Sequence, residues 1–224
     1  TLDETYQIYR SKKLGRSGLY LLDLYLESNK LPFPKTIVYM NDEGYEPFYQ
    51  FAIEEYKLQD HYLYQFYHGY DYDYRTYLDG RNPYSPQDNI DDRFFTHLID
   101  RHFGLATSPQ YEQVEGGIDA FFRIMKIVLD PEKQPVLFHC WGGKHRTGII
   151  AMAIRYLQGP AWTTPLDGPP VMIEGVPFQL NAAQKEYIMH NKSSIRIENF
   201  QFMKQLSLDP RFIALKEEWA SSQN

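Results

Sequence analysis

The sequence has a single cysteine, Cys140, so no disulfide can form within the chain, and the redox compartment stays open. It has no apolar run long enough to span a bilayer, which argues against membrane insertion. Positive charge is also scarce, since 23 Lys and Arg stand against 29 Asp and Glu, and the formal net charge is −6. Such a chain is not expected to bind nucleic acid or an anionic membrane surface, and any positive field must be local.

The chain also begins without methionine, at Thr1, from which we expect that an N-terminal segment has been removed. A soluble protein, secreted or periplasmic, is favoured on that ground. The 224 residues suit one domain with a good-sized core, and the hydrophobic and charged fractions, 43% and 23%, are ordinary for a globular protein. No repeat or low-complexity linker divides the sequence. We therefore expect a single domain over residues 1–224 and a monomer.

What the chain does have is the stretch HCWGGKHRTGII at 139–150, between a short apolar run and an amphipathic one. We predict a strand, a loop and a helix in that order. Cys140 then stands at the end of a buried strand, and the five residues before Arg146 suffice to wrap backbone N–H groups around one phosphate. Gly142 and Gly143 permit the positive φ angles that such a nest requires.

This loop suits nucleophilic attack on phosphorus. The helix that starts near Arg146 adds the positive end of its dipole, so the concavity that holds a phosphate also stabilises a thiolate on Cys140. A thiolate is a competent nucleophile. The guanidinium of Arg146 can donate to two phosphoryl oxygens, which a lysine cannot do in that geometry. Thr147 can donate its hydroxyl to the sulfur, and His139 is expected to orient the loop.

The pattern His-Cys-x5-Arg-Thr-Gly at 139–148 resembles the active-site loop of the cysteine-dependent protein tyrosine phosphatase superfamily. The version GKHR at 143–146 is most similar to the tyrosine-phosphatase-like phytases, which are inositol polyphosphate phosphatases, and to the atypical dual-specificity phosphatases that act on inositol pyrophosphates. The resemblance is close over 118–158 and only architectural elsewhere. It implies an α/β fold with a central mixed, mostly parallel sheet flanked by helices. The alternative, a core cysteine followed by an accidental Gly-rich turn, is disfavoured because all the required residue types occur in order.

Phosphomonoester cleavage also needs an acid to protonate the leaving alkoxide. The resembled family supplies it from an aspartate on a loop some tens of residues before the cysteine. Asp100 fits that place, although the usual Trp-Pro of that loop is absent. Two alternatives stay open. His102 is followed by Phe-Gly, as the acid is in some relatives, and Asp71 or Asp73 takes the role if residues 61–68 form the strand before the acid loop.

The loop's own side chains bear on the substrate. Lys144 is a second cation beside the phosphate, which is superfluous for one buried tyrosine phosphate but useful where neighbouring phosphates crowd the rim. The expected substrate-binding set is completed by the rest of the loop: Trp141, Gly142, Gly143 and His145. Trp141 either forms a wall of the pocket or packs under the loop, and a solvated, outward-pointing side chain is the alternative for Lys144.

We therefore expect a hydrolase that needs no metal or cofactor and cleaves myo-inositol polyphosphate, phytate in particular, through a phosphocysteine intermediate. The first alternative is a protein-tyrosine, dual-specificity or phosphoinositide phosphatase. A phosphate-binding pseudophosphatase is the non-enzymatic alternative, and the intact catalytic residue types argue against it. Redox sensing through Cys140 is a further alternative that lacks a resolving cysteine.

Hydrophobic periodicity and turn residues predict the remaining elements. Residues 1–18 are interpreted as loop, and 69–93 either as a specificity insertion over the active site or as an exposed hairpin packed by its own tyrosines. Strands are predicted over 36–41, 61–68, 93–99 and 135–138, with a small hairpin around 171–173 and 176. Helices are predicted over 19–26, 46–57, 117–129, 147–158, 181–191, 195–206 and 212–219.

Overall fold

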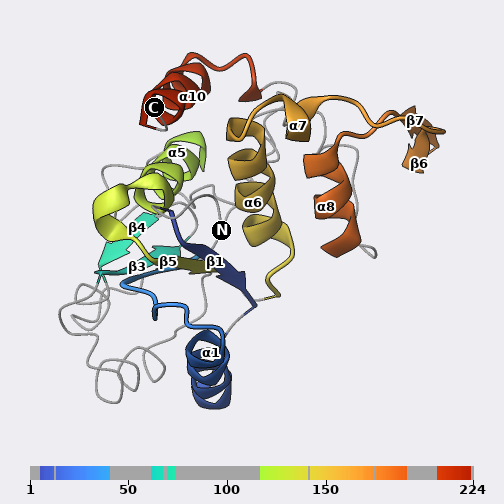
Figure 1. Ribbon diagram of the computed structural model, residues 1–224. Coiled ribbons are helices and arrows are strands. Elements are labelled where there is room, and N and C mark those ends of the chain that lie inside the picture. Colours follow the sequence, from blue (N-terminus) through green and yellow to red (C-terminus); the bar gives the residue numbers. More distant parts are fainter. Residues whose placement is uncertain are drawn as a thin grey trace, which may run out of the picture. The chain divides into compact units, whose positions relative to one another are not determined.

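The computed structural model describes residues 6–12, 14–40, 62–67, 70–73, 117–140, 142–173, 175–190 and 206–222. Its helices and strands are labelled in Figure 1. Internal contacts divide the chain into two compact units. The first comprises residues 1–88 and 100–147, and the second comprises 89–99 and 148–224. The expectations of one domain over 1–224, of a monomer and of a specificity insertion at 69–93 stay predictions.

A five-stranded sheet forms the centre of the first unit, in the order β1-β5-β2-β3-β4. Its strands are β1 (Ile8–Ser11), β2 (Thr36–Tyr39), β3 (Tyr62–Tyr67), β4 (Tyr70–Asp73) and β5 (Val136–His139). Parallel pairing joins β1, β5, β2 and β3, and β4 runs antiparallel to β3. The predicted mixed, mostly parallel α/β sheet is therefore confirmed.

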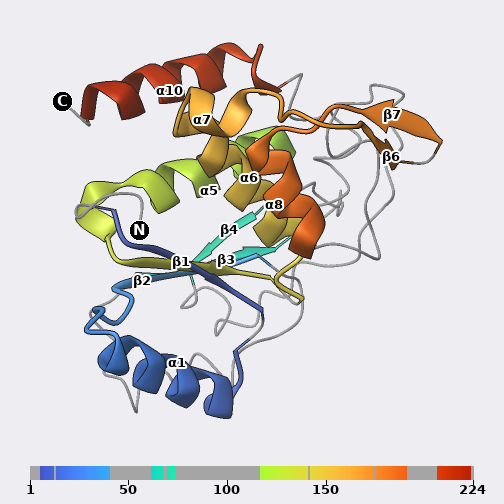
Figure 2. The ribbon, with the colours of Figure 1, turned by 45° about the vertical axis from the view of Figure 1, so that its right-hand side comes forward.

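Helices cover both faces of this sheet. Figure 2 shows α1 (Arg16–Ser28) on one face and α5 (Gly117–Leu129) on the other, with the 3-10 turn η2 (Pro131–Lys133) leading from α5 into β5. Strands enclosed in this way are expected to be apolar without alternation. In β2 and β5 every residue is indeed buried. The two strands that carry the site therefore run through the core.

Strand β1 corrects the sequence analysis, which predicts a loop over residues 8–11. The tetrapeptide Ile-Tyr-Arg-Ser has two polar residues, and all four positions are only half-buried, so it lacks the pattern of a strand. Its extended conformation comes from parallel pairing with β5, a tertiary interaction that outweighs local propensity. The start of α1 at Arg16 also lies inside the stretch predicted as loop.

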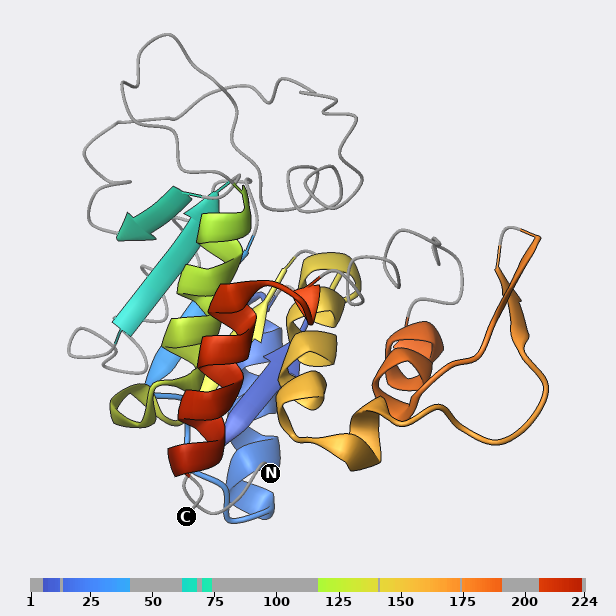
Figure 3. The ribbon, with the colours of Figure 1, turned by 90° about the horizontal axis from the view of Figure 1, so that it is seen from above.

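The second unit is mainly helical. Helix α6 (His145–Leu157) enters it at Gly148, and is followed by α7 (Pro160–Thr163), strands β6 (Val171–Ile173) and β7 (Val176–Phe178), α8 (Ala182–His190) and α10 (Pro210–Ser222). Figure 3 shows the antiparallel hairpin of β6 and β7 extending beyond α7 and α8. Among the residues described, no helix is long and apolar enough to cross a bilayer.

Most of the predicted elements that fall on described residues are confirmed. The helix over 117–129 has the predicted bounds, and those over 19–26, 147–158, 181–191 and 212–219 are confirmed with ends shifted by up to three residues. The strands over 36–41, 61–68 and 135–138 and the 171–176 hairpin are confirmed as well. The short α7 was missed. The elements over 46–57 and 93–99, and nearly all of 195–206, lie outside the described residues.

Candidate active site

Cys140 lies at the carboxyl edge of the sheet, directly after β5. The register places the last residue of β5, His139, level with Ser11 of β1 on one side and with Tyr39 of β2 on the other. Three parallel strands therefore end together at the cysteine, which is 5% exposed. Ligands of α/β sheets bind at such carboxyl ends.

The loop after Cys140 rests on the end of β1. Gly143 has a φ of 65°, and a Cβ added there would lie 2.7 Å from the Ser11 carbonyl oxygen and 2.8 Å from the Lys12 nitrogen. Only glycine fits both the left-handed backbone and this close approach. The positive φ predicted for Gly142 is wrong, since Gly142 is not among the positive-φ glycines.

Arg146 ties the other side of the loop to β2. It lies in the first turn of α6, and its Nη1 donates a hydrogen bond to the carbonyl oxygen of Met40 at 3.0 Å. Met40 is the residue directly after β2 and is fully buried. The loop from Cys140 to Arg146 therefore contacts β1 through Gly143 and the end of β2 through the guanidinium, so Cys140 and Arg146 lie at the same edge of the sheet.

Two buried polar side chains lie behind the loop. Thr147 is fully buried, and within the described part of the chain its Oγ1 has no hydrogen-bond partner. His139 is also fully buried, with its ring centroid 4.8 Å from that of Tyr39 and tilted by 30°. The orienting role expected for His139, and the donation expected from the Thr147 hydroxyl to the Cys140 sulfur, stay predictions.

The remaining predicted loop residues are placed unevenly. Lys144 and Gly142 are exposed, and His145 is the first residue of α6. Trp141 lies outside the described residues, so its role stays a prediction. Across the ranges that the structure describes, no group of three or more His, Cys, Asp or Glu side chains is arranged to hold a metal ion.

Of the four candidates for the general acid, the structure describes the backbone of two, Asp71 and Asp73. Asp71 and Asp73 lie on β4, three strand positions from β5, which corresponds to about 14 Å between backbones. The assignment of Asp71 or Asp73 as the acid stays a prediction. Asp100 and His102 lie outside the described residues and stay predictions.

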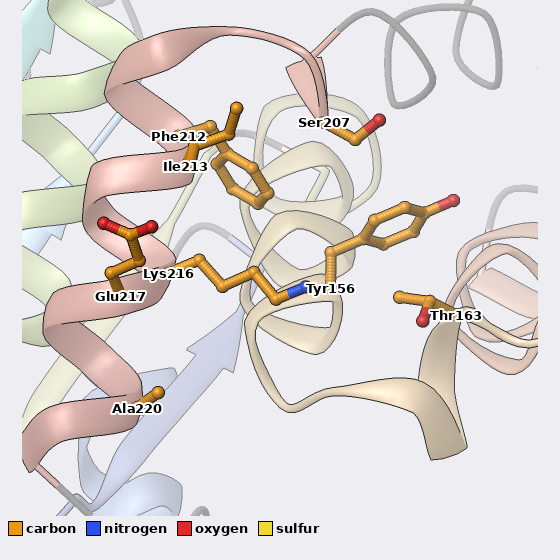
Figure 4. A pocket seen from close by; sticks show the side chains of 8 residues that line it. All are labelled: Tyr156, Thr163, Ser207, Phe212, Ile213, Lys216, Glu217 and Ala220. Carbon is orange, nitrogen blue, oxygen red and sulfur yellow. The ribbon is translucent and has the colours of Figure 1, made fainter.

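A separate pocket of about 550 Å³ lies within the second unit. Figure 4 shows Lys216 of α10 extending along it toward Tyr156, which is in the last turn of α6. Burial raises the pKa of Tyr156, and the hydrogen bond from the Asn181 amide to its hydroxyl, 2.8 Å long, offsets part of that rise. The pocket is lined by Tyr156, Thr163, Ser207, Phe212, Ile213, Lys216, Glu217 and Ala220. None of these residues belongs to the loop at Cys140.

The structure brings together a central parallel strand, a cysteine at its carboxyl end, a glycine packed against the neighbouring strand and an arginine at a helix N-terminus. This arrangement is the one that the resemblance to cysteine-dependent phosphatases predicts. Comparison with known proteins agrees. The model of the tyrosine phosphatase family matches residues 60–166. Two solved structures share the fold: the core catalytic domain of the PP-IP phosphatase SIW14 from Saccharomyces cerevisiae in complex with citrate, and the Siw14 catalytic core. Their TM-scores are 0.51 and 0.52, with 22% and 21% identity over 95% and 96% of this chain and 88% and 93% of theirs.

Local sequence matches are closer but short. The chain is 46% identical over 43 residues to inositol diphosphatase DSP2 of Oryza sativa subsp. japonica, and 47% identical over 45 residues to inositol diphosphatase SIW14 of Saccharomyces cerevisiae. These segments make up 19% and 20% of this chain and 21% and 16% of the relatives, so the match spans about a fifth of their length. The chain is thus similar in part of its sequence to the tyrosine phosphatase family, and relatives that share the local match are named as inositol diphosphatases.

The seat of Gly143 on β1 gives a prediction about stability. Gly143→Ala forces a Cβ into the Ser11 carbonyl and a side chain into the left-handed region, so we expect the free energy of unfolding to fall by about 2 kcal/mol. Urea denaturation measures it. Gly142→Ala is the matched control, because the nearest heavy atom to an added Cβ is 3.9 Å away and the backbone is not left-handed. If the free energy of unfolding falls equally in both variants, the close approach of Gly143 to β1 does not stabilise the protein.

The buried hydroxyl of Thr147 gives a second prediction. Thr147→Val keeps the shape and removes a desolvated hydroxyl without a partner, so the free energy of unfolding should stay the same or rise by up to about 1 kcal/mol. We expect the hydroxyl to donate to the Cys140 sulfur during the reaction, so turnover of an aryl phosphate should nevertheless fall about 10- to 100-fold in this variant. Thr147→Ser should retain most activity. A variant that loses stability while keeping its turnover would mark the hydroxyl as structural only.

Proposed function

We propose that this chain hydrolyses phosphomonoesters of myo-inositol polyphosphate, phytate first among them, through a phosphocysteine intermediate. The observation that carries the proposal is the loop from Cys140 to Arg146, held between β1 and β2 with the cysteine at the carboxyl end of β5. Its geometry suits a thiolate nucleophile and a phosphoryl group in one concavity.

The first step is in-line attack of the Cys140 thiolate on phosphorus. The sulfur–phosphorus bond forms as the ester oxygen leaves, and Asp100 protonates that oxygen. Arg146 and the loop amides stabilise the charge on the equatorial oxygens. In the second step water attacks phosphorus, gives up its proton to the same carboxylate and releases inorganic phosphate. Thr147 stabilises the sulfur as it departs. His102 is the alternative acid.

The substrate assignment depends on charge at the mouth of the loop. Lys144 is exposed next to Gly143, and among the described residues its ammonium forms no ion pair or hydrogen bond. Such a cation favours a substrate with several phosphates in an otherwise acidic protein. The relatives named as inositol diphosphatases support a phosphatase acting on inositol phosphates.

Those relatives also favour a second candidate, cleavage of a diphosphate group on an inositol ring. The same loop chemistry serves both, because a phosphate monoester and a terminal phosphoryl of a diphosphate present similar oxygens to Arg146. They differ in the leaving group, which is an alkoxide in phytate and a phosphate in the diphosphate. A phosphate is the better leaving group, so diphosphate cleavage depends less on the acid at position 100.

The deciding measurement is release of phosphate from phytate, from an inositol diphosphate and from a phosphotyrosine peptide, all in the presence of a chelator. We expect release from phytate by the native protein and none by Cys140→Ser, since serine does not supply a thiolate. Acid quenching during turnover should trap phosphate on Cys140. Release from the diphosphate alone would select the second candidate. Release from the peptide alone, or silence on all three, would overturn the proposal.

Arg146→Lys tests the fork. The charge is retained, but lysine cannot donate to two oxygens at once, and the bond to the Met40 carbonyl changes. We expect kcat to fall about 100- to 1,000-fold, as is typical when a donor to a developing oxyanion is removed. Urea denaturation checks that the variant is folded. If kcat falls by less than about tenfold in a folded variant, the two-oxygen contact of the Arg146 guanidinium does not contribute to the rate-limiting step.

A further inference from the structure

Lys12 lies at the rim of the phosphate-binding loop, a position that the sequence did not reveal. Ser11 of β1 is paired with His139 of β5, so Lys12 and Cys140 are the next residues along two neighbouring parallel strands. Neighbouring strands are about 4.8 Å apart. The backbone of Lys12 is therefore adjacent to that of the nucleophile.

A second, independent observation places Lys12 against the middle of the loop. A Cβ added at Gly143 would lie 2.8 Å from the Lys12 nitrogen and 2.9 Å from its Cα. The backbone at this point is also held by a hydrogen bond, which the Ser11 hydroxyl donates to the Lys12 carbonyl at 2.8 Å. The Lys12 side chain therefore starts from a backbone position that is held next to the loop.

The side chain of Lys12 is available for a ligand. It is exposed, and across the ranges described its ammonium makes no hydrogen bond or ion pair. Lysine carries a compact charge on a flexible four-carbon stem, which suits a phosphate of variable position better than one of fixed geometry. Lys144 provides a second such charge from the loop itself. Two exposed lysines thus lie within or next to the loop in a chain whose net charge is −6.

We propose that Lys12 is a specificity-determining residue that binds a second phosphoryl group of the substrate while the reacting group occupies the loop between Cys140 and Arg146. The inference rests on the proposed function and extends it, because it states what distinguishes a polyphosphorylated substrate from a simple monoester. A ligand with a single phosphate fills the loop and gains little from Lys12. A ligand with adjacent phosphates gains a contact of opposite charge.

The test uses inorganic probes, so that it does not depend on the identity of the organic substrate. Binding of pyrophosphate and of phosphate to Cys140→Ser protein is measured by calorimetry at low ionic strength, where exposed charges are least screened. Lys12→Ala in that background should weaken pyrophosphate binding about fivefold and phosphate binding less than twofold. Lys12→Arg should restore most of the pyrophosphate affinity, because it restores the charge.

The control is Lys126→Ala, which removes one exposed charge from α5, near the helix end that leads into the start of β5. It should change neither affinity by more than twofold. Equal loss of phosphate and pyrophosphate affinity in Lys12→Ala would overturn the inference in favour of a general loop defect. Unchanged affinities would overturn it as well.

Kinetics separate this inference from the function on which it rests. In the active protein Lys12→Ala should lower kcat/KM for phytate about fivefold, mainly through KM, and leave an aryl phosphate within twofold. A native protein that cleaves the aryl phosphate and no inositol phosphate would overturn the proposed function. The contrast between pyrophosphate and phosphate would still decide the role of Lys12.

Discussion

The close approach of Gly143 to the backbone of Ser11 and Lys12 is the constraint on which the rest of the site depends. A loop that rests directly on the end of a neighbouring strand has a fixed height above the sheet, and the residues on either side of the glycine take their positions from it. Cys140 is fixed by β5 on one side. On the other, Arg146 reaches across to the carbonyl of Met40. Without the contact between backbones, Cys140 and the Arg146 guanidinium would be joined by a loop with no contact to the end of β1.

Two polar side chains, His139 and Thr147, are fully buried on either side of the loop in the sequence. A buried hydroxyl without a partner costs about 1–3 kcal/mol, and Thr147 has one directly after Arg146. Buried polar groups without a partner are destabilising, but they are common at functional sites. There such a group forms its hydrogen bond only when a ligand or an intermediate is present. The ring of His139 lies against that of Tyr39, one strand away in the sheet. The proposed reaction gives the Thr147 hydroxyl a use, as a donor to the departing sulfur.

The sequence predicted the parts of the fold that depend on local pattern. Helix α5 has its apolar residues at helical spacing, β2 and β5 are continuous apolar runs, and Cys140 follows β5 as predicted. The part that failed is non-local. The sequence of β1 has no alternation or apolar run typical of a strand, and β1 is extended because it pairs with β5. The sequence therefore predicts neither this strand nor the position of Lys12 next to the loop. The φ angle at Gly142 was also misjudged, since one left-handed residue suffices where the loop meets β1.

The hydrogen bond from Arg146 to the Met40 carbonyl has a thermodynamic consequence. When a long side chain becomes ordered only on ligand binding, its loss of conformational entropy makes binding weaker. For an arginine this loss is up to about 2 kcal/mol. Here the guanidinium is already ordered by the protein's own backbone. That conformational entropy is lost when the chain folds, so it does not reduce the affinity for a ligand that binds later. The arginine is preorganised.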